Sequence, residues 1–169
     1  MTKRILIWAI IVCAVAGTAY HIISTYLRSD EEKVRDAIED CAGAIETGRP
    51  HRVYLALQFN LDEGYRHRGE MVPVDKSGAM RYLGYLVREY QDFDVDIRRI
   101  DVTIEGDRAT ADVWGRITAA PKDNPAERSE LLTAGGRNHA RIELRKDDGD
   151  WNIVSSERLE GTLDDMPAE

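Results

Sequence analysis

The sequence predicts an α+β domain, in which three helices pack on a strongly curved antiparallel sheet, behind an N-terminal transmembrane helix. An uncharged, apolar run extends from Ile5 to Leu27. Apolar residues then recur at spacings of three and four up to Tyr90, which is the period of amphipathic helices. From Phe93 the spacing changes to two, the period of half-buried strands. Helices followed by a meander of strands are typical of the α+β class.

The apolar run at the N-terminus has the length of a membrane span. At about 1.5 Å per residue, a helix over residues 5–27 covers a hydrocarbon core of roughly 30 Å. A cleaved signal peptide is the alternative, because small residues at 14–19 offer cleavage sites, but the run continues past them. A buried helix of a soluble protein is a third interpretation, although few such helices are apolar all round for six turns. We expect residues 1–28 to form an uncleaved membrane anchor.

The charges on either side of this run predict its orientation. Lys3 and Arg4 precede it, whereas Asp30, Glu31 and Glu32 follow it closely. The positive-inside rule therefore places the rest of the chain on the periplasmic side of the membrane, or outside the cell if the segment is cleaved.

Composition limits the classes of partner. The 169 residues provide one domain plus an extension, and the net charge of −8 argues against nucleic acids and anionic lipid surfaces as partners of the folded part. Cys13 lies in the apolar run and Cys41 is the other cysteine, so the domain has no partner for an intramolecular disulfide. Cys41 lies on an apolar helical stripe and is interpreted as a small core residue.

The helices have readable ends. Ser29 and Glu32 form a capping-box pattern at the start of the first helix, and Gly48 follows its last turn. Pro50 suits the first turn of a short second helix that continues to Leu57. The third helix is predicted to begin after Asp75 or Ser77.

The region between the second and third helices is less regular. Residues 60–75 are interpreted as a loop with short strands. Only Met71 to Val74 resembles a strand, and Pro73 makes it an edge strand. Gly84 lowers the stability of the third helix by about 1 kcal/mol relative to alanine, so we expect it to mark a close approach to another element.

The strands contain a change of parity. Apolar residues alternate up to Ile97 and again from Ile100, so the parity flips between Arg98 and Arg99, which predicts a β-bulge and a bend. A turn over 105–107 returns the chain, a loop covers 119–138, and a final hairpin turns at Asp148 and Gly149.

Four segments resemble the nuclear transport factor 2-like superfamily, which includes ketosteroid isomerase, scytalone dehydratase and polyketide cyclases. They are "TGRP", "GYRHRGEMVPVDKSGAMRYL", "IEGDRATADVWGRI" and "RIELRKDDGDWNIVSS". The resemblance covers about residues 30–158 and implies a cone with a mouth. We expect the domain to comprise residues 29–160, with residues 161–169 as a flexible tail. The resemblance also implies that Trp151 packs against the helices rather than contacting a ligand.

The resemblance further implies that an enzyme of this fold would place an acid/base pair inside the cone. The candidates for catalysis are Asp112, His67 and His139, and those for ligand binding are Tyr65, Trp114 and Arg141. Each also has a plain structural interpretation, since alternating charged residues on a strand usually form a solvated face. No metal-ligand spacing, phosphate loop or dinucleotide fingerprint occurs, so we expect neither a metal nor a cofactor. The isomerase residues of the superfamily match no stretch closely enough to be placed.

Two functions follow as expectations. The first is a membrane-tethered domain without catalysis, which associates with itself through an exposed apolar sheet face or with an envelope partner, or holds a small apolar ligand. The second is a small lyase, isomerase or cyclase. An open cavity in which two titratable groups converge favours the enzyme, and a cone filled by its own side chains favours the first function.

Overall fold

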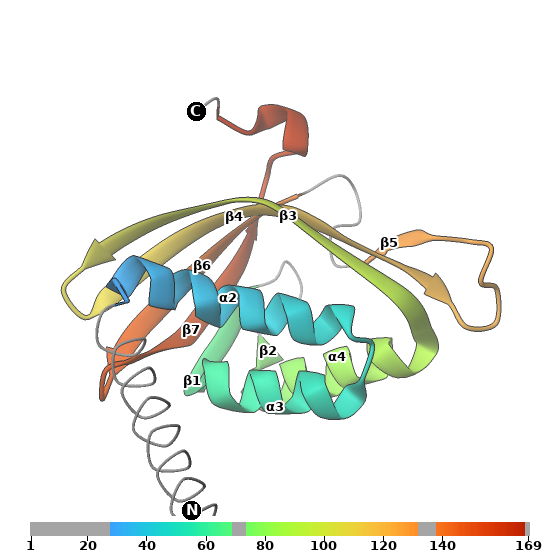
Figure 1. Ribbon diagram of the computed structural model, residues 1–169, viewed down its shortest axis with the longest axis horizontal. Coiled ribbons are helices and arrows are strands. Elements are labelled where there is room, and N and C mark those ends of the chain that lie inside the picture. The colour runs from blue at the N-terminus through green and yellow to red at the C-terminus, as the bar shows by residue number, and fades with distance from the viewer. Residues whose placement is uncertain (1–27, 69–73, 132–137, 168–169) are drawn as a thin grey trace, which may run out of the picture.

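The computed structural model describes residues 28–68, 74–131 and 138–167. Three helices, α2 (Asp30–Glu46), α3 (Pro50–Asn60) and α4 (Lys76–Glu89), lie against one side of a curved sheet (Figure 1). The predicted anchor lies outside the described residues. Within the described ranges, no helix is both long enough and apolar enough to cross a membrane.

The sheet is continuous but does not close on itself. Its strands are β1 (Leu61–Arg68), β2 (Val74–Asp75), β3 (Tyr90–Glu105), β4 (Arg108–Pro121), β5 (Ser129–Leu131), β6 (His139–Asp147) and β7 (Asp150–Leu159). The order is β2-β1-β7-β6-β4-β3, with β5 paired to β4. All pairs are antiparallel except β1 with β7. The predicted α+β class, with three helices on a curved and mainly antiparallel sheet, is confirmed.

The helix boundaries follow the predicted caps. Both halves of the capping box are present in α2, where the Ser29 hydroxyl accepts from the backbone N–H of Glu32 and the Glu32 carboxylate accepts from the N–H of Ser29. Pro50 opens α3, and the Asp75 carboxylate accepts from the N–H of Gly78 at the start of α4. Burial raises the pKa of the Cys41 thiol on α2 to about 12, with Asp40 adding to the shift, so Cys41 stays protonated.

The region read as a loop contains the largest departure from expectation. Residues 61–68 form a full strand, β1, which adds to the edge of β7 in parallel. The prediction of a loop there was wrong because "LDEGYRHR" is polar and lacks alternation, and its strand state depends on pairing with residues nearly a hundred positions later. Of the predicted edge strand at 71–74, only Val74 lies in the described part, where it belongs to β2.

The bend of the sheet is located where the parity change predicts it. The register between β3 and β4 shifts between Ile97 and Arg99, which leaves Arg98 as the extra residue. Opposite this bulge, a Cβ added to Gly115 would lie 2.7 Å from the backbone oxygen of Asp96. Only glycine allows the two strands to approach this closely. In contrast, a Cβ on Gly84 would meet nothing within 4 Å, so the expected close approach at Gly84 was wrong.

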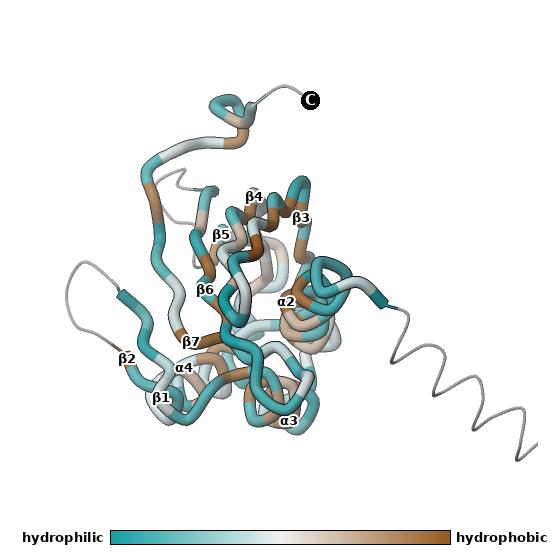
Figure 2. The backbone as a smooth tube through the Cα atoms, turned by 90° about the vertical axis from the view of Figure 1, so that its left-hand side faces the viewer, coloured by the Kyte–Doolittle hydropathy of each residue, from teal (hydrophilic) through white to brown (hydrophobic). Residues whose placement is uncertain are grey.

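The core fills the space between the concave face and the helices. Figure 2 shows hydrophobic and hydrophilic residues alternating along β3 and β4, so that one face of the sheet is apolar. Trp151 is 4% exposed, and its indole N–H donates to Asp30 at the start of α2. The predicted packing role of Trp151 is therefore confirmed.

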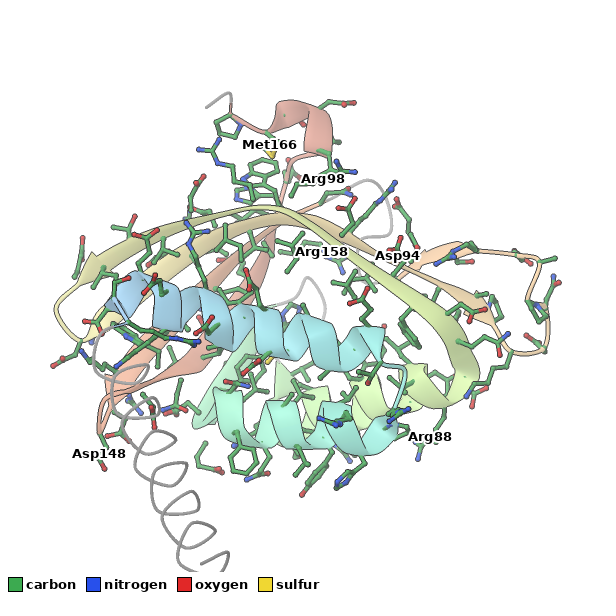
Figure 3. The ribbon with its side chains drawn as sticks, in the orientation of Figure 1. Arg88, Asp94, Arg98, Asp148, Arg158 and Met166 are labelled. Carbon is green, nitrogen blue, oxygen red and sulfur yellow. The ribbon has the colours of Figure 1, made fainter. Side chains whose placement is uncertain are left out.

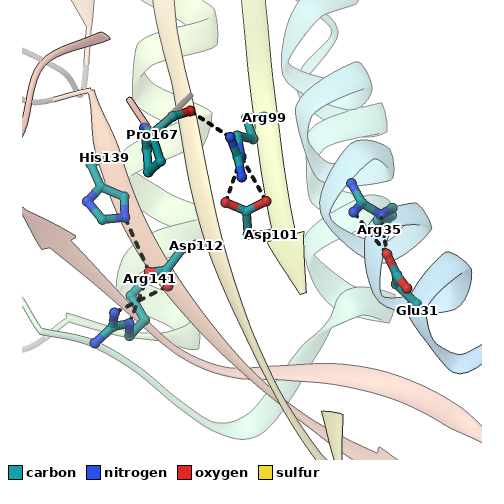
Figure 4. Close-up of polar contacts among 8 residues, drawn as sticks. All are labelled: Glu31, Arg35, Arg99, Asp101, Asp112, His139, Arg141 and Pro167. Carbon is teal, nitrogen blue, oxygen red and sulfur yellow. Dashed lines mark hydrogen bonds and ion pairs between the residues drawn. The ribbon is translucent and has the colours of Figure 1, made fainter. Parts of the chain in front are cut away.

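The convex face of the sheet is charged rather than apolar. Its ion pairs include Arg99 with Asp101, both on β3, and Arg141 of β6 with Asp112 of β4 (Figure 4). Among the described residues, the exposed large hydrophobic side chains are Tyr54, Phe59, Tyr82, Tyr85 and Ile104, and only Ile104 belongs to the sheet. The apolar sheet face expected for self-association is absent from the part of the chain that the structure describes. Self-association itself stays a prediction.

The segment after β7 crosses the convex face. The backbone oxygen of Gly161 accepts from the N–H of Asn138, and the Arg99 guanidinium donates to the backbone oxygen of Pro167. A Cβ on Gly161 would lie 3.2 Å from the Trp114 ring. The predicted flexible tail therefore has defined contacts with the sheet up to Pro167.

Replacing Gly115 by alanine should destabilise the fold. The new methyl group would overlap the Asp96 carbonyl, which belongs to the backbone and has little room to move, so we expect a loss of about 1–3 kcal/mol in the free energy of unfolding. Chemical denaturation followed by circular dichroism measures it. The matched control is Gly84→Ala, which should gain about 1 kcal/mol through helix propensity. Equal effects of the two substitutions would contradict the role given to Gly115.

Candidate functional site

A cavity of about 530 Å³ lies between the concave face of the sheet and the helices. Its wall is mainly apolar, with Ile38 and Ile45 from α2, Leu83 from α4, and Val95, Val113 and Ile117 from the bent strands. The volume falls within the range of about 300–1,000 Å³ that is typical of small-ligand sites. The cone is therefore open and is not filled by its own side chains.

A hydrogen-bonded group of three side chains lies in this apolar wall. The Tyr65 hydroxyl is 2.7 Å from the Ser156 Oγ, and the His67 Nδ1 is 2.9 Å from the same oxygen. Tyr65 and His67 alternate on β1, so both face the cavity, and Ser156 comes from the paired strand β7. This is the convergence of two titratable groups on the concave side that an acid/base function requires.

A second bulge brings the polar residues of β7 into the cavity. Glu143 pairs with Ser155 and Leu144 pairs with Ile153, so Val154 is an extra residue. Before it, Trp151 and Ile153 face the core; after it, Ser156 and Arg158 line the cavity. Ser155 instead donates to the Glu143 carboxylate. Sequence reasoning missed Ser156 and Arg158 because "WNIVSSER" shows an uninterrupted alternation up to Ser155, and no glycine marks the bulge.

The environment fixes the protonation of this group. Burial raises the pKa of Tyr65, so its phenol stays protonated, although its bond to Ser156 acts in the opposite direction. Burial lowers the pKa of His67, and the nearby positive charge of Arg158 lowers it further. His67 is therefore held as a neutral imidazole at neutral pH.

Two hydrogen-bond arrangements are open to these side chains. When Nδ1 of His67 carries the proton, it donates to Ser156, Ser156 donates to Tyr65, and the phenol O–H is free to donate to a ligand. The Nε2 of His67 is then an acceptor or base. When Nε2 carries the proton, the direction of the chain reverses and the imidazole presents a donor instead. In the first arrangement the group offers a ligand the phenol O–H as a donor and the imidazole Nε2 as a base. In the second arrangement it offers the imidazole Nε2–H as a donor and the phenol oxygen as an acceptor.

The other candidates lie on the opposite face of the sheet. Asp112 accepts from His139 Nε2 at 3.2 Å and from two nitrogens of Arg141 at 3.0 and 3.3 Å (Figure 4). The Trp114 ring is 6% exposed and stacks on His139, with ring centroids 3.9 Å apart. His139 borders the cavity, yet its imidazole is engaged by Asp112 and Trp114. The His–Asp pair exists, but it is not formed inside the cone, because residues 112 and 114 alternate with cavity-lining Val113.

Across the described ranges, no three His, Cys, Asp or Glu residues are grouped so that they could hold a metal ion.

Of the six candidate residues, the structure brings Tyr65 and His67 together in the cavity. It groups the other four, Asp112, Trp114, His139 and Arg141, on the opposite face of the sheet.

Solved structures with this fold are numerous, whereas searches of family models and of curated proteins find no match. A proposed aromatic ring hydroxylase from Novosphingobium aromaticivorans is 18% identical, with a TM-score of 0.62 over 80% of this chain and 95% of that one. A proposed dehydratase of the nuclear transport factor 2-like family from Streptomyces avermitilis is 12% identical, with a TM-score of 0.58 over 77% and 96%.

A nuclear transport factor 2-like protein from Cytophaga hutchinsonii is 11% identical, with a TM-score of 0.59 over 77% of this chain and 97% of that one. The chain therefore has the nuclear transport factor 2-like fold. At these identities the likeness concerns the fold alone.

His67 should titrate below 6.5, the ordinary pKa of histidine. Removing the positive charge with Arg158→Gln should raise this pKa but leave it below 6.5, because the burial remains. Histidine-selective NMR over pH 4.5–8 measures it, and Arg88→Gln, on a surface helix, is the charge-matched control. A wild-type midpoint above 6.5 would contradict the buried setting of His67.

The same shift gives the sign of a pH effect on stability. The unfolded state binds the His67 proton more tightly than the folded state does. The contribution of neutral His67 to the free energy of unfolding is therefore fully present above pH 6.5, and it is lost as the pH falls from 6.5 towards the lowered pKa of His67 in the folded state.

Proposed function

We propose that this protein is a membrane-tethered domain, exposed on the periplasmic side, that binds a small and largely apolar molecule in its cone. The observation that carries the proposal is the open cavity of about 530 Å³, whose wall is mainly apolar and contains the Tyr65–Ser156–His67 cluster. An apolar wall with a few convergent polar groups is the usual character of a small-ligand site. The uncharged run over residues 5–27 supports the tether, and its flanking charges support the orientation.

A bulky residue in the cavity wall should abolish binding. Ala140 lines the cavity from β6, so Ala140→Phe would place a ring in the ligand space. We expect decan-1-ol to shift the NMR signal of His67 in the wild-type protein but not in this variant. Ala126→Phe, at an exposed position outside the cavity, is the control and should bind normally. Unchanged binding by Ala140→Phe would place the ligand elsewhere.

The tether has a separate test. The full-length protein should stay with the membrane fraction during alkaline carbonate extraction. Arginines at Ile11 and Val15 should release it, because each costs about 2.5–3.5 kcal/mol at the centre of a span. The mass of the purified chain distinguishes an intact anchor from a cleaved signal peptide. Release of the wild-type protein with an intact N-terminus would contradict the tether.

The second candidate is a small lyase, isomerase or cyclase, and the Tyr65–Ser156–His67 cluster favours it. A neutral imidazole beside a protonated phenol offers a base and a hydrogen-bond donor in a mainly apolar cavity, which is what proton transfer next to a carbonyl needs. Neighbours named as a hydroxylase and a dehydratase share only the fold, so they do not decide between binding and catalysis. The open cavity in which Tyr65 and His67 converge meets the condition given above for an enzyme, and ligand binding is proposed first because both functions require it.

A further inference from the structure

We propose that the ligand of the cone is a small, mainly apolar carboxylate, whose negative charge is bound by Arg158 at the mouth of the cavity. This rests on the proposed function and names the chemical class of the ligand. Arg158 lies on the helix side of the sheet, near the end of β7 (Figure 3). Its side chain both lines the cavity and is exposed, which places it where the cavity opens to solvent.

Arg158 is unpaired among the residues that the structure describes. Within the described part of the chain, its guanidinium makes no hydrogen bond or ion pair, whereas most other arginines of the sheet, such as Arg99, Arg141 and Arg145, bond to carboxylates. An unpaired guanidinium facing an apolar cavity presents several N–H donors in one plane. That arrangement matches the two oxygens of a carboxylate.

The charges around the cavity favour an anion. Arg116 also borders the cavity, and its Nε is buried without a hydrogen-bond partner among the described residues, 3.5 Å from an Asp96 oxygen. Glu157 is the one acidic residue among the described residues that line the cavity. Its Cα pairs with that of Arg141 in the sheet, and its charge favours the ionised form of that arginine on the convex face. Among the described residues that line the cavity, two arginines therefore stand against one carboxylate, although the protein as a whole carries a net charge of −8.

The interior of the cavity limits the chemical character of the rest of the ligand. Beyond the mouth the wall is mainly aliphatic, so a second charge would be buried with little compensation. The Tyr65–Ser156–His67 cluster supplies neutral donors and acceptors, which suit a carbonyl or hydroxyl group on the ligand rather than another ion. A ligand with one carboxylate, bound at the mouth, and an apolar body, held inside the cavity, fits both regions of the site.

The experiment compares decanoate with decan-1-ol, which share a chain length and differ in charge. Both are titrated at pH 7.5 into full-length protein, and the NMR signal of the His67 imidazole reports binding inside the cavity. We expect decanoate to bind about five- to tenfold more tightly than decan-1-ol. Arg158→Gln should remove this preference and leave the affinity for decan-1-ol unchanged. Arg88→Gln should retain the preference.

The outcomes separate the two proposals. Equal affinities of the two ligands, or a preference that survives Arg158→Gln, would overturn the carboxylate assignment and leave an apolar-ligand site. Failure of both ligands to shift the His67 signal would overturn the binding function and, with it, the assignment. Since Arg158 is exposed, its substitution is not expected to unfold the protein, and the comparison of ligands in the wild type needs no variant.

Discussion

The close approach of β3 and β4 at Gly115 is the constraint on which the cone depends. At this point the Asp96 carbonyl occupies the space that a Cβ would take, and Arg98 bulges out of the neighbouring ladder. The long strands can therefore bend around the helices instead of continuing straight past them (Figure 1). Without this bend, the concave face would not meet α2 and α4 along its length, and the apolar wall would not enclose a cavity.

The second bulge, at Val154, determines which side chains of β7 line the cavity. It reverses the parity of β7, so that the strand contributes apolar residues to the core at one end and Ser156 and Arg158 to the cavity at the other. The parallel addition of β1 then places Tyr65 and His67 on either side of Ser156. The polar cluster thus depends on two features of backbone pairing rather than on any motif of consecutive residues.

The sequence allowed the prediction of those features that are encoded locally. The caps at Ser29 and Asp75 and the bulge beside Arg98 each depend on residues within a few positions, and each was found where expected. Strand β1 was missed because its polar residues form a strand only by pairing with β7. Ser156 and Arg158 were missed because the bulge at Val154 leaves no mark in the alternation. Tyr65 and His67 were named as candidates, but their convergence depends on β1 and was not foreseen.

The two histidine sites show why the concave side is the better place for chemistry. On the convex face, Asp112 is held by two nitrogens of Arg141, and His139 is fixed between Asp112 and the Trp114 ring. Both oxygens of that carboxylate are already engaged in hydrogen bonds, and the stacked imidazole has little freedom to turn. In the cavity, the hydrogen bond of the His67 ring to the described residues runs through Nδ1 to a hydroxyl that can reverse its direction, and burial keeps the ring neutral. The familiar His–Asp pair therefore reads as part of a structural network, whereas the less conspicuous Tyr–Ser–His group retains the freedom to exchange a proton with a ligand.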